Sequence, residues 1–237
     1  MHDPLRPLRR LMTPVAYLIG RLGIGLLVSI ACLWAFGSIV EDLLEKEPIR
    51  FDQWLAVSLH SAATPLATTV FALVTLLGSQ AIVAVGALLA VYFVWRREWL
   101  NLAVWAVALA GGELLNLLLK LLFARPRPVF SVPLAVAQSY SFPSGHAMMS
   151  IIAYGLLAYF AVGAVDARRW RLIVAALAAF LVVAIGFSRL YLGVHYFTDV
   201  IGGFAAGWVW LSTCVWALRY GRDRLGQKLD RAPPTAV

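Results

Sequence analysis

The chain has 237 residues, of which 62% are hydrophobic and only 14% are charged. Soluble domains are closer to half apolar and a quarter charged, so this composition excludes an ordinary soluble protein. The net charge of +8 would suit nucleic-acid binding, but most cations lie in short segments between apolar runs, where they set membrane topology. We therefore expect an all-α, polytopic membrane protein with no nucleic-acid partner.

Six apolar stretches approach the length needed to cross a bilayer as helices, which is about 20 residues. The first stretch follows three arginines, as in a signal peptide, but it lacks a small-x-small cleavage site and is interpreted as an uncleaved span. A single helical bundle would then occupy residues 1–237, with cytoplasmic tails at 1–13 and 221–237. The predicted spans are Pro14–Val40, Gln80–Trp95, Leu100–Leu122, His146–Val165, Trp170–Phe187 and Tyr196–Leu218.

The apolar segment Thr64–Gly78 is short, and it could form a further span or lie against the bundle or the membrane interface. With six spans and the amino terminus inside, most arginines and lysines lie on the inner side of the membrane. A seventh span would separate the basic clusters at 96–97 and 168–171 from the basic amino terminus, so the positive-inside rule favours six. The acidic stretch Glu41–Gln53 is then expected outside, as a solvated helix end and loop.

Three polar clusters lie at the ends of apolar stretches, and the six-span layout places all of them on the outer face of the membrane. In the last cluster, His195 and Asp199 are four residues apart, so a helix would put both on one face. A carboxylate that accepts one imidazole N–H leaves the other ring nitrogen free to attack a substrate. An isolated pair of this kind also occurs as a simple packing contact, and two such side chains do not make a zinc site.

The middle cluster, Pro143-Ser144-Gly145-His146, precedes an apolar run and is typical of a helix start with Ser144 as the N-cap. Gly145 would let an anion approach the free N–H groups of the first helical turn, and His146 would lie beside that anion. Ordinary capping explains the Ser-Gly pair equally well, but a histidine directly inside a membrane helix favours a functional site.

The remaining site candidates are cations, because Lys120, Arg127 and Arg189 each lie at or just beyond the end of a span. Snorkelling of a long side chain to the membrane interface would explain any one of them. It does not explain why all three lie on the histidine side, against the positive-inside preference. Arg125 forms a second Arg-Pro pair and is an ambiguous candidate.

Together the clusters resemble the signature of the type 2 phosphatidic-acid phosphatase superfamily, which is Lys-x6-Arg-Pro, then Pro-Ser-Gly-His, then Ser-Arg-x5-His-x3-Asp. The sequence matches all three parts between Lys120 and Asp199, and the x6 spacing selects Arg127 over Arg125. One cluster alone would be a weak signal, whereas three in order with the correct spacing are a strong one.

The resemblance implies that His195 attacks phosphorus, that Asp199 orients this imidazole, and that His146 exchanges protons with the leaving group and with water. It also implies that fixed protein donors hold the phosphate, so that neither a metal ion nor another cofactor is required. The implied phosphate-binding residues are Lys120, Arg127, Ser144, Gly145 and Arg189.

Two features inside the spans lie outside this signature. Glu113 is an acid deep in a span, and we interpret it as part of a structural polar cluster that pairs with Arg21 or Lys120. The Gly203-x3-Gly207 spacing indicates close helix packing, which we expect within the bundle rather than in a dimer.

The sequence thus predicts a phosphatase of the bacterial cytoplasmic membrane, with its site at the outer face and a lipid phosphate as substrate. The resemblance suggests phosphatidylglycerophosphate, undecaprenyl diphosphate or phosphatidic acid. Two alternatives stay open: a phosphotransferase that passes the group to another lipid, and a transporter or binding protein for phosphorylated lipids.

Overall fold

The fold is all-α, as expected for apolar segments that must satisfy their own backbone hydrogen bonds in a bilayer. The computed structural model describes the backbone of residues 6–45 and 49–230, and the side chains of residues 25–45 and 49–224. The described helices are α1 (Arg6–Leu44), α2 (Arg50–Ser61), α3 (Pro65–Leu76), α4 (Gln80–Trp95), α5 (Trp99–Phe123), α6 (Gly145–Gly163), α7 (Arg168–Tyr191) and α8 (Phe197–Asp230).

Six segments of the described chain are long and apolar enough to cross a membrane, which confirms the predicted number of spans. Five of them lie on α1, α5, α6, α7 and α8. The boundaries on α5, α6 and α7 fall within a few residues of the predicted ones, whereas α1 and α8 extend well beyond the predicted spans. Many leucine, valine and aromatic side chains on these helices point outward, where lipid would cover them. The chain is therefore an integral membrane protein.

The second span differs from the prediction, because it begins at Pro65 and runs through α3 and α4 to Trp95. Thr64 caps α3 by accepting the Ala67 N–H at 3.3 Å, and the helix then breaks at the turn that contains Gly78. The Tyr154 hydroxyl donates to the Leu77 carbonyl at 2.6 Å and ties this turn to α6. The segment 64–78 thus forms the first part of the second candidate span and does not add a seventh.

Helix α6 lies at the centre of the bundle, where it packs most extensively against α8 and α7. The close approach of α8 depends on two glycines: a Cβ on Gly203 would lie 2.6 Å from the Ser144 carbonyl oxygen, and one on Gly207 would lie 2.7 Å from that of Met148. The Gly203-x3-Gly207 motif therefore packs helices within the bundle, as predicted.

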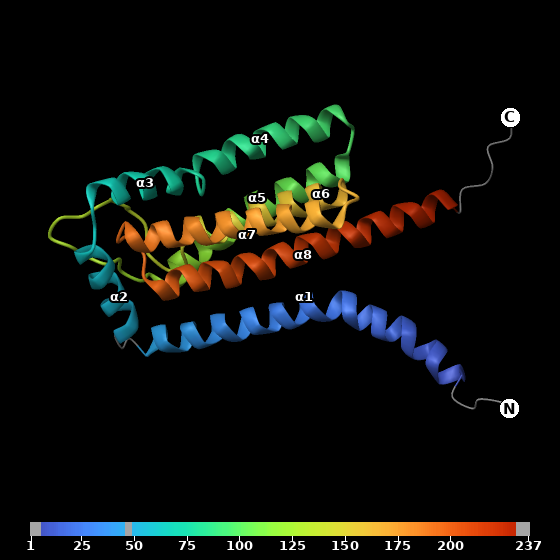
Figure 1. The fold of residues 1–237 in the computed structure, drawn as a ribbon, viewed down its shortest axis with the longest axis horizontal. Coiled ribbons are helices and arrows are strands. Elements are labelled where there is room, and N and C mark those ends of the chain that lie inside the picture. Colours follow the sequence, from blue (N-terminus) through green and yellow to red (C-terminus); the bar gives the residue numbers. More distant parts are fainter. Residues whose placement is uncertain (1–5, 46–48, 231–237) are drawn as a thin grey trace.

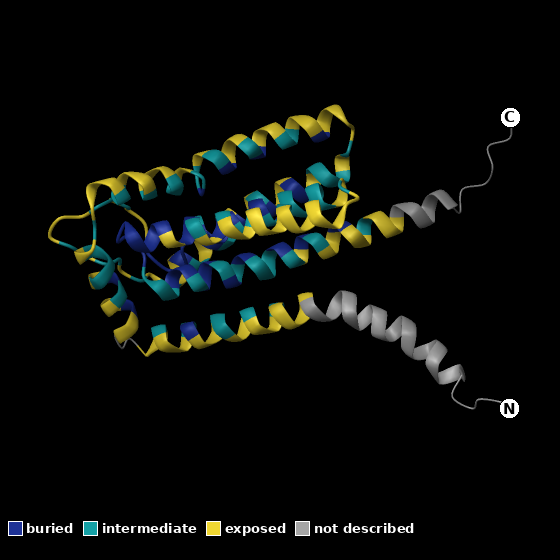
Figure 2. Cartoon of the chain, viewed as in Figure 1, coloured by how far each residue is buried: buried dark blue, intermediate teal, exposed yellow. Residues whose placement is uncertain are grey.

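Most buried polar residues lie at one end of the bundle. Figure 1 shows that α2, the loop 124–144 and the first turns of α6 and α8 meet at this polar end. The first turn of α1 and the last turn of α8 lie at the opposite end. Figure 2 shows that buried residues concentrate toward the polar end, whereas the outer faces of α3 and α4 are exposed.

The acidic stretch Glu41–Gln53 is an exposed helix end at Glu41, Asp42 and Glu45, as the sequence predicted, but the prediction of a solvated residue fails at Asp52. Helix α1 continues to Leu44, α2 begins at Arg50, and the Asp52 side chain is only 1% exposed. The prediction was wrong for Asp52 because this carboxylate has buried hydrogen-bond partners on α8, which a local reading of charge could not show.

Candidate active site

Two backbone hydrogen bonds hold the three motif clusters together. The Ser141 N–H donates to the Arg125 carbonyl at 2.9 Å, which joins the two arms of the loop 124–144. The Ser144 N–H donates to the Asp199 carbonyl at 2.9 Å, which fixes the start of α6 against the start of α8. Residues far apart in the sequence are therefore held in one place by main-chain contacts.

Helix α5 places Lys120 in the site. The buried residues of α5 recur about every fourth position and form one stripe along the helix. Lys120 is the last residue of that stripe and points inward rather than to lipid. Ala124 then adopts a left-handed conformation with φ of 43°, which ends the helix and turns the chain into the loop. The buried stripe comprises Val104, Trp105, Ala108, Gly112, Asn116 and Lys120.

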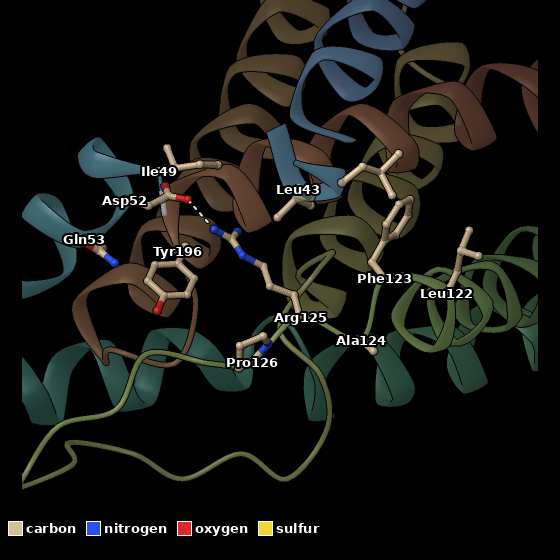
Figure 3. Close-up of a pocket in the computed structure, with 11 residues that line it drawn as sticks. Leu43, Ile49, Asp52, Gln53, Leu122, Phe123, Ala124, Arg125, Pro126 and Tyr196 are labelled. Atoms are coloured by element: carbon tan, nitrogen blue, oxygen red, sulfur yellow. Dashed lines mark hydrogen bonds and ion pairs between the residues drawn. The ribbon is translucent and has the colours of Figure 1, made fainter. Parts of the chain in front are cut away.

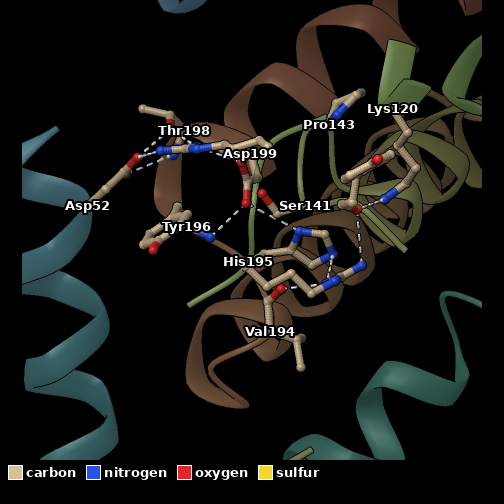
Figure 4. Close-up of polar contacts among 12 residues, drawn as sticks. Asp52, Lys120, Ser141, Pro143, Val194, His195, Tyr196, Thr198 and Asp199 are labelled. Atoms are coloured by element: carbon tan, nitrogen blue, oxygen red, sulfur yellow. Dashed lines mark hydrogen bonds and ion pairs between the residues drawn. The ribbon is translucent and has the colours of Figure 1, made fainter. Parts of the chain in front are cut away.

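His195 and Asp199 form the predicted pair and are both buried, at 3% and 0% exposure. The imidazole Nδ1 lies 3.4 Å from Asp199 Oδ2, which also accepts the Tyr196 N–H at 2.8 Å. The other ring nitrogen, Nε2, lies 3.1 Å from Nη1 of Arg127. Because arginine can only donate, Nε2 accepts and Nδ1 carries the hydrogen that faces Asp199 (Figure 4).

Burial lowers the pKa of His195 to about 4. Asp199 opposes this effect by favouring the charged imidazolium, whereas Arg127 and Arg189 reinforce it. The imidazole is therefore neutral at pH 7, which is the protonation state that a nitrogen nucleophile needs.

The three predicted cations converge on this imidazole from three elements. Arg127 donates from Nε to the Ser139 carbonyl at 2.6 Å, and Lys120 is hydrogen-bonded to the Tyr140 carbonyl. Arg189, in the last turn of α7, donates to the Thr75 hydroxyl of α3 at 2.6 Å. Burial lowers the pKa of Arg127 because the site keeps the guanidinium away from bulk water, and Asp199 partly opposes this effect by favouring the charged form.

Two buried donors in this region have no hydrogen-bond partner within the described residues, namely Ser144 Oγ and Arg189 Nε. Ser144 occupies the predicted N-cap position of α6, but its side chain makes no capping bond. Buried polar groups are normally paired, so unpartnered donors beside a nucleophile indicate where an anionic ligand would bind. The first turn of α6 adds free backbone N–H groups to the same place.

A cleft of about 680 Å³ opens on the predicted residues. His146 lines it, as does Gly145, whose missing side chain matters because a Cβ there would lie 2.9 Å from Oδ1 of Asn116. The apolar part of the lining comes from α4 and α6, so the cleft joins a charged end to an apolar side. Its site residues are Lys120, Arg127, Gly145, His146, Arg189 and His195.

Arg125 and Asp52 are the residues whose position sequence analysis did not predict. Arg125 donates from Nη1 to Asp199 at 2.6 Å and from Nη2 to Asp52 at 2.8 Å. Burial opposes the charge on Arg125, but the two carboxylates outweigh it and raise the pKa of the guanidinium. Figure 3 shows Arg125 and Asp52 at the wall of a second cavity of about 560 Å³, between the end of α1, α2 and the end of α5.

The available signal for these two residues was weak. Arg125 was visible as a second Arg-Pro pair, and Asp52 lies four residues before buried Ala56 on one face of α2. Neither sequence pattern predicts which residue of another helix Arg125 or Asp52 would contact.

Glu113 makes no ion pair with Lys120, which was one of the two partners that the sequence suggested. Among the described side chains, the ion pairs do not include Glu113. Glu113 is exposed toward the cleft, beside the buried stripe of α5. The alternative partner, Arg21, lies outside the described side chains.

Comparison with known proteins identifies the protein family to which the chain belongs. The sequence profile of the PAP2 superfamily matches residues 99–223, which include all three clusters and slightly more than half of the chain. The protein therefore belongs to the PAP2 superfamily.

Individual relatives come from bacteria. Phosphatidylglycerophosphatase B of Bacillus subtilis (strain 168) is 40% identical over 116 residues, which cover 48% of this chain and 56% of that protein. The chain thus aligns with little more than half the length of this curated relative.

Two solved structures share the fold. The transmembrane PAP2-type phosphatidylglycerolphosphate phosphatase from Bacillus subtilis matches with a TM-score of 0.69 and 27% identity, over 84% of this chain and 96% of that one. LpxE of Aquifex aeolicus matches with a TM-score of 0.58 and 23% identity, over 72% and 98% of the two chains. The second likeness concerns the fold alone.

Proposed function

We propose that this protein is a membrane phosphatase that removes a phosphate from a lipid phosphomonoester or diphosphate through a phosphohistidine intermediate. The observation that carries the proposal is the position of His195. Its Nε2 lies beside Arg127 and at the cleft, while its Nδ1 faces the buried Asp199 carboxylate. Membership of the PAP2 superfamily supports the same reaction class.

In the first step, Nε2 of His195 attacks phosphorus, so that a P–N bond forms and the bond from phosphorus to the leaving oxygen breaks. His146 donates a proton to that oxygen. Asp199 stabilises the positive charge that develops on the imidazole. In the second step, His146 accepts a proton from water, the water oxygen attacks phosphorus, and the P–N bond breaks to release phosphate.

Fixed positive charge supplies most of the stabilisation in this mechanism. Lys120, Arg127 and Arg189 would hold the phosphoryl oxygens, with the Ser144 hydroxyl and the Gly145 N–H as further donors. The unpartnered Ser144 Oγ and Arg189 Nε support this assignment. The described residues contain no group of three or more metal-ligating side chains, and we propose that the protein cations act in place of a metal ion.

The cleft supports an amphiphilic substrate, because its charged end continues into an apolar wall on α4 and α6. A lipid could place its phosphate among the cations while its chains remain in the bilayer. The exposed arginines at the opposite end of the bundle favour a cytoplasmic location for that end, and this supports our proposal that the site lies on the outer face of the membrane. The named activity of the relatives makes phosphatidylglycerophosphate the first substrate to test.

The test is phosphate release by the purified protein in mixed micelles from phosphatidylglycerophosphate, undecaprenyl diphosphate and phosphatidic acid. We expect release from at least one lipid, no release by His195→Ala, and full activity in EDTA. Release that survives in His195→Ala would contradict the nucleophile, and EDTA inhibition reversed by a divalent ion would contradict the metal-free mechanism. A rate that requires a second lipid as acceptor would indicate phosphate transfer, and binding without release would indicate a carrier.

A further inference from the structure

Arg125 lies next to the motif arginine but has a different environment. The 680 Å³ cleft is lined by Arg127 and not by Arg125. Arg125 instead lies between two buried carboxylates, with its guanidinium 4.4 Å above the ring of Tyr196. An arginine placed in this way acts on the carboxylates rather than on a substrate in the cleft.

We propose that Arg125 and Asp52 form a positioning pair that fixes the Asp199 carboxylate, and through it the His195 imidazole, for attack on phosphorus. This inference rests on the proposed function. It adds two residues that touch neither the substrate nor the nucleophile, and it gives α2 a part in the reaction.

Each oxygen of Asp199 has its own partner. Oδ1 accepts from Nη1 of Arg125 at 2.6 Å. Oδ2 accepts the Tyr196 N–H at 2.8 Å and faces Nδ1 of His195 at 3.4 Å. A rotation of the carboxylate would break its contact with Arg125. The guanidinium therefore holds the plane of the carboxylate, and the carboxylate holds the imidazole in the tautomer whose Nε2 can attack.

Asp52 fixes Arg125 and the first turn of α8 together. Its Oδ2 accepts from Arg125 at 2.8 Å and from the Thr198 hydroxyl, and its Oδ1 accepts the Thr198 N–H at 3.0 Å. Thr198 directly precedes Asp199. A carboxylate at a helix N-terminus satisfies a free N–H and interacts favourably with the helix dipole, so Asp52 stabilises the turn that carries Asp199 (Figure 4).

The pair also sets the charge near the nucleophile. The other charged or titratable groups around His195 come from every neighbouring element: Lys120 of α5, Arg127 of the loop, His146 of α6, Arg189 of α7 and Asp199 of α8. Loss of the Arg125 charge would leave Asp199 less neutralised, and the imidazole would bind a proton more readily. Loss of the Asp52 charge would have the opposite effect.

The test uses Arg125→Gln, Asp52→Asn and the double variant, with Arg50→Gln as the control. Arg50 is an exposed cation on the same helix as Asp52, so its substitution removes a charge from α2 without touching the pair. We measure kcat, KM and the acid limb of kcat/KM against pH with the lipid phosphate that the wild type hydrolyses.

We expect each single variant to lose about tenfold or more in kcat with little change in KM, because the carboxylate would no longer hold the imidazole in the tautomer and orientation needed for attack. The acid limb should move to higher pH in Arg125→Gln, to lower pH in Asp52→Asn, and lie between them in the double variant. If Arg125 and Asp52 only maintained the fold, their substitution would lower the fraction of active protein without moving the acid limb of kcat/KM. Unchanged limbs, shifts in the same direction, or a loss confined to KM would overturn the inference.

Arg125→Lys keeps the charge but not the two-pronged geometry, and it extends the test if Arg125→Gln does not fold. It should lower kcat while leaving the acid limb in place. If the wild type releases no phosphate from any lipid, the proposed function fails by itself. The positioning pair is then decided by NMR titration of His195 in ¹⁵N-histidine-labelled protein, where opposite shifts in the two single variants support it and equal titrations overturn it.

Discussion

The two ends of the helical bundle carry the same kinds of charged residue in opposite environments. At the end that contains α2 and the loop 124–144, Arg125 and Arg189 are largely buried and contact named partners. At the other end the arginines of the α4–α5 turn, of the start of α7 and of late α8 are exposed. These exposed residues are Arg96, Arg97, Arg168, Arg169, Arg171, Arg219, Arg222 and Arg224.

Burying a charged side chain costs free energy, so a buried and partnered arginine indicates a functional or structural site. An exposed arginine at a helix end only helps to set the membrane topology. An exposed ion pair contributes about 0–1 kcal/mol, so the exposed end tolerates substitution. Breaking a buried pair costs about 3–5 kcal/mol, because the remaining charge has no water to solvate it. The buried end is therefore where charge substitutions should affect both function and stability.

The largest expected effect comes from removing a buried cation at the site end. Arg189→Gln should lower kcat/KM for the lipid phosphate by about 100- to 1,000-fold, the usual loss when one donor to the transition state is removed. Arg168→Gln removes an exposed arginine from the other end of the same helix and should leave kcat/KM unchanged. Enzyme kinetics and size-exclusion elution of both purified variants would check this. Equal losses in the two variants would mean that the ends do not differ as proposed.

A smaller effect is expected from pH, again at the buried end. Burial lowers the pKa of His195 to about 4, and the nucleophile must be neutral. The kcat/KM of the wild type should therefore fall as the pH drops through about 4, and the protonation of His195 should cause no change in kcat/KM near neutral pH. An exposed histidine would titrate near 6.5 instead. An acid limb close to that value, unaffected by Asp199→Asn, would show that His195 is not held in the buried environment described.

The sequence predicted much of the buried end because the chemistry there requires particular residue types at fixed spacing. His195 and Asp199 lie on adjacent turns as their four-residue separation indicated, and Lys120 ends the buried stripe of α5. The number of spans followed equally well from length, hydropathy and the distribution of arginines. These features depend on residues that are close in the sequence, or on the repeat of apolar residues along the chain.

The features that were missed depend on contacts between distant segments. The pairing of Asp52 with Arg125 and Thr198 joins α2 to the start of α8, and no local pattern encodes it. The same is true of the turn at Gly78, where a Cβ would lie 3.1 Å from Cδ2 of His146. Local polarity indicated a solvated loop for Asp52, whereas tertiary partners made burial of its charge favourable.

The smallest expected effect concerns stability. Substitution of one glycine at each end of the bundle allows a direct comparison of the two ends. A Cβ on Gly203 would lie 2.6 Å from the Ser144 carbonyl oxygen, whereas one on Gly163 would have nothing within 4 Å. Gly203→Ala should lower the free energy of unfolding by about 1–3 kcal/mol, because α8 would have to move away from the start of α6. Gly163→Ala lies at the opposite end of α6 and should change stability by no more than about 0.5 kcal/mol.

Thermal unfolding in detergent measures both variants, and phosphate release adds a second readout. The backbone at Gly203 faces the turn that presents Ser144 and Gly145, so Gly203→Ala should also reduce kcat at temperatures where the protein is fully folded. Stability loss without any loss of kcat would mean that the α6–α8 contact supports the bundle but does not set the geometry of the site. Equal stability of the two variants would contradict the close packing on which that geometry depends.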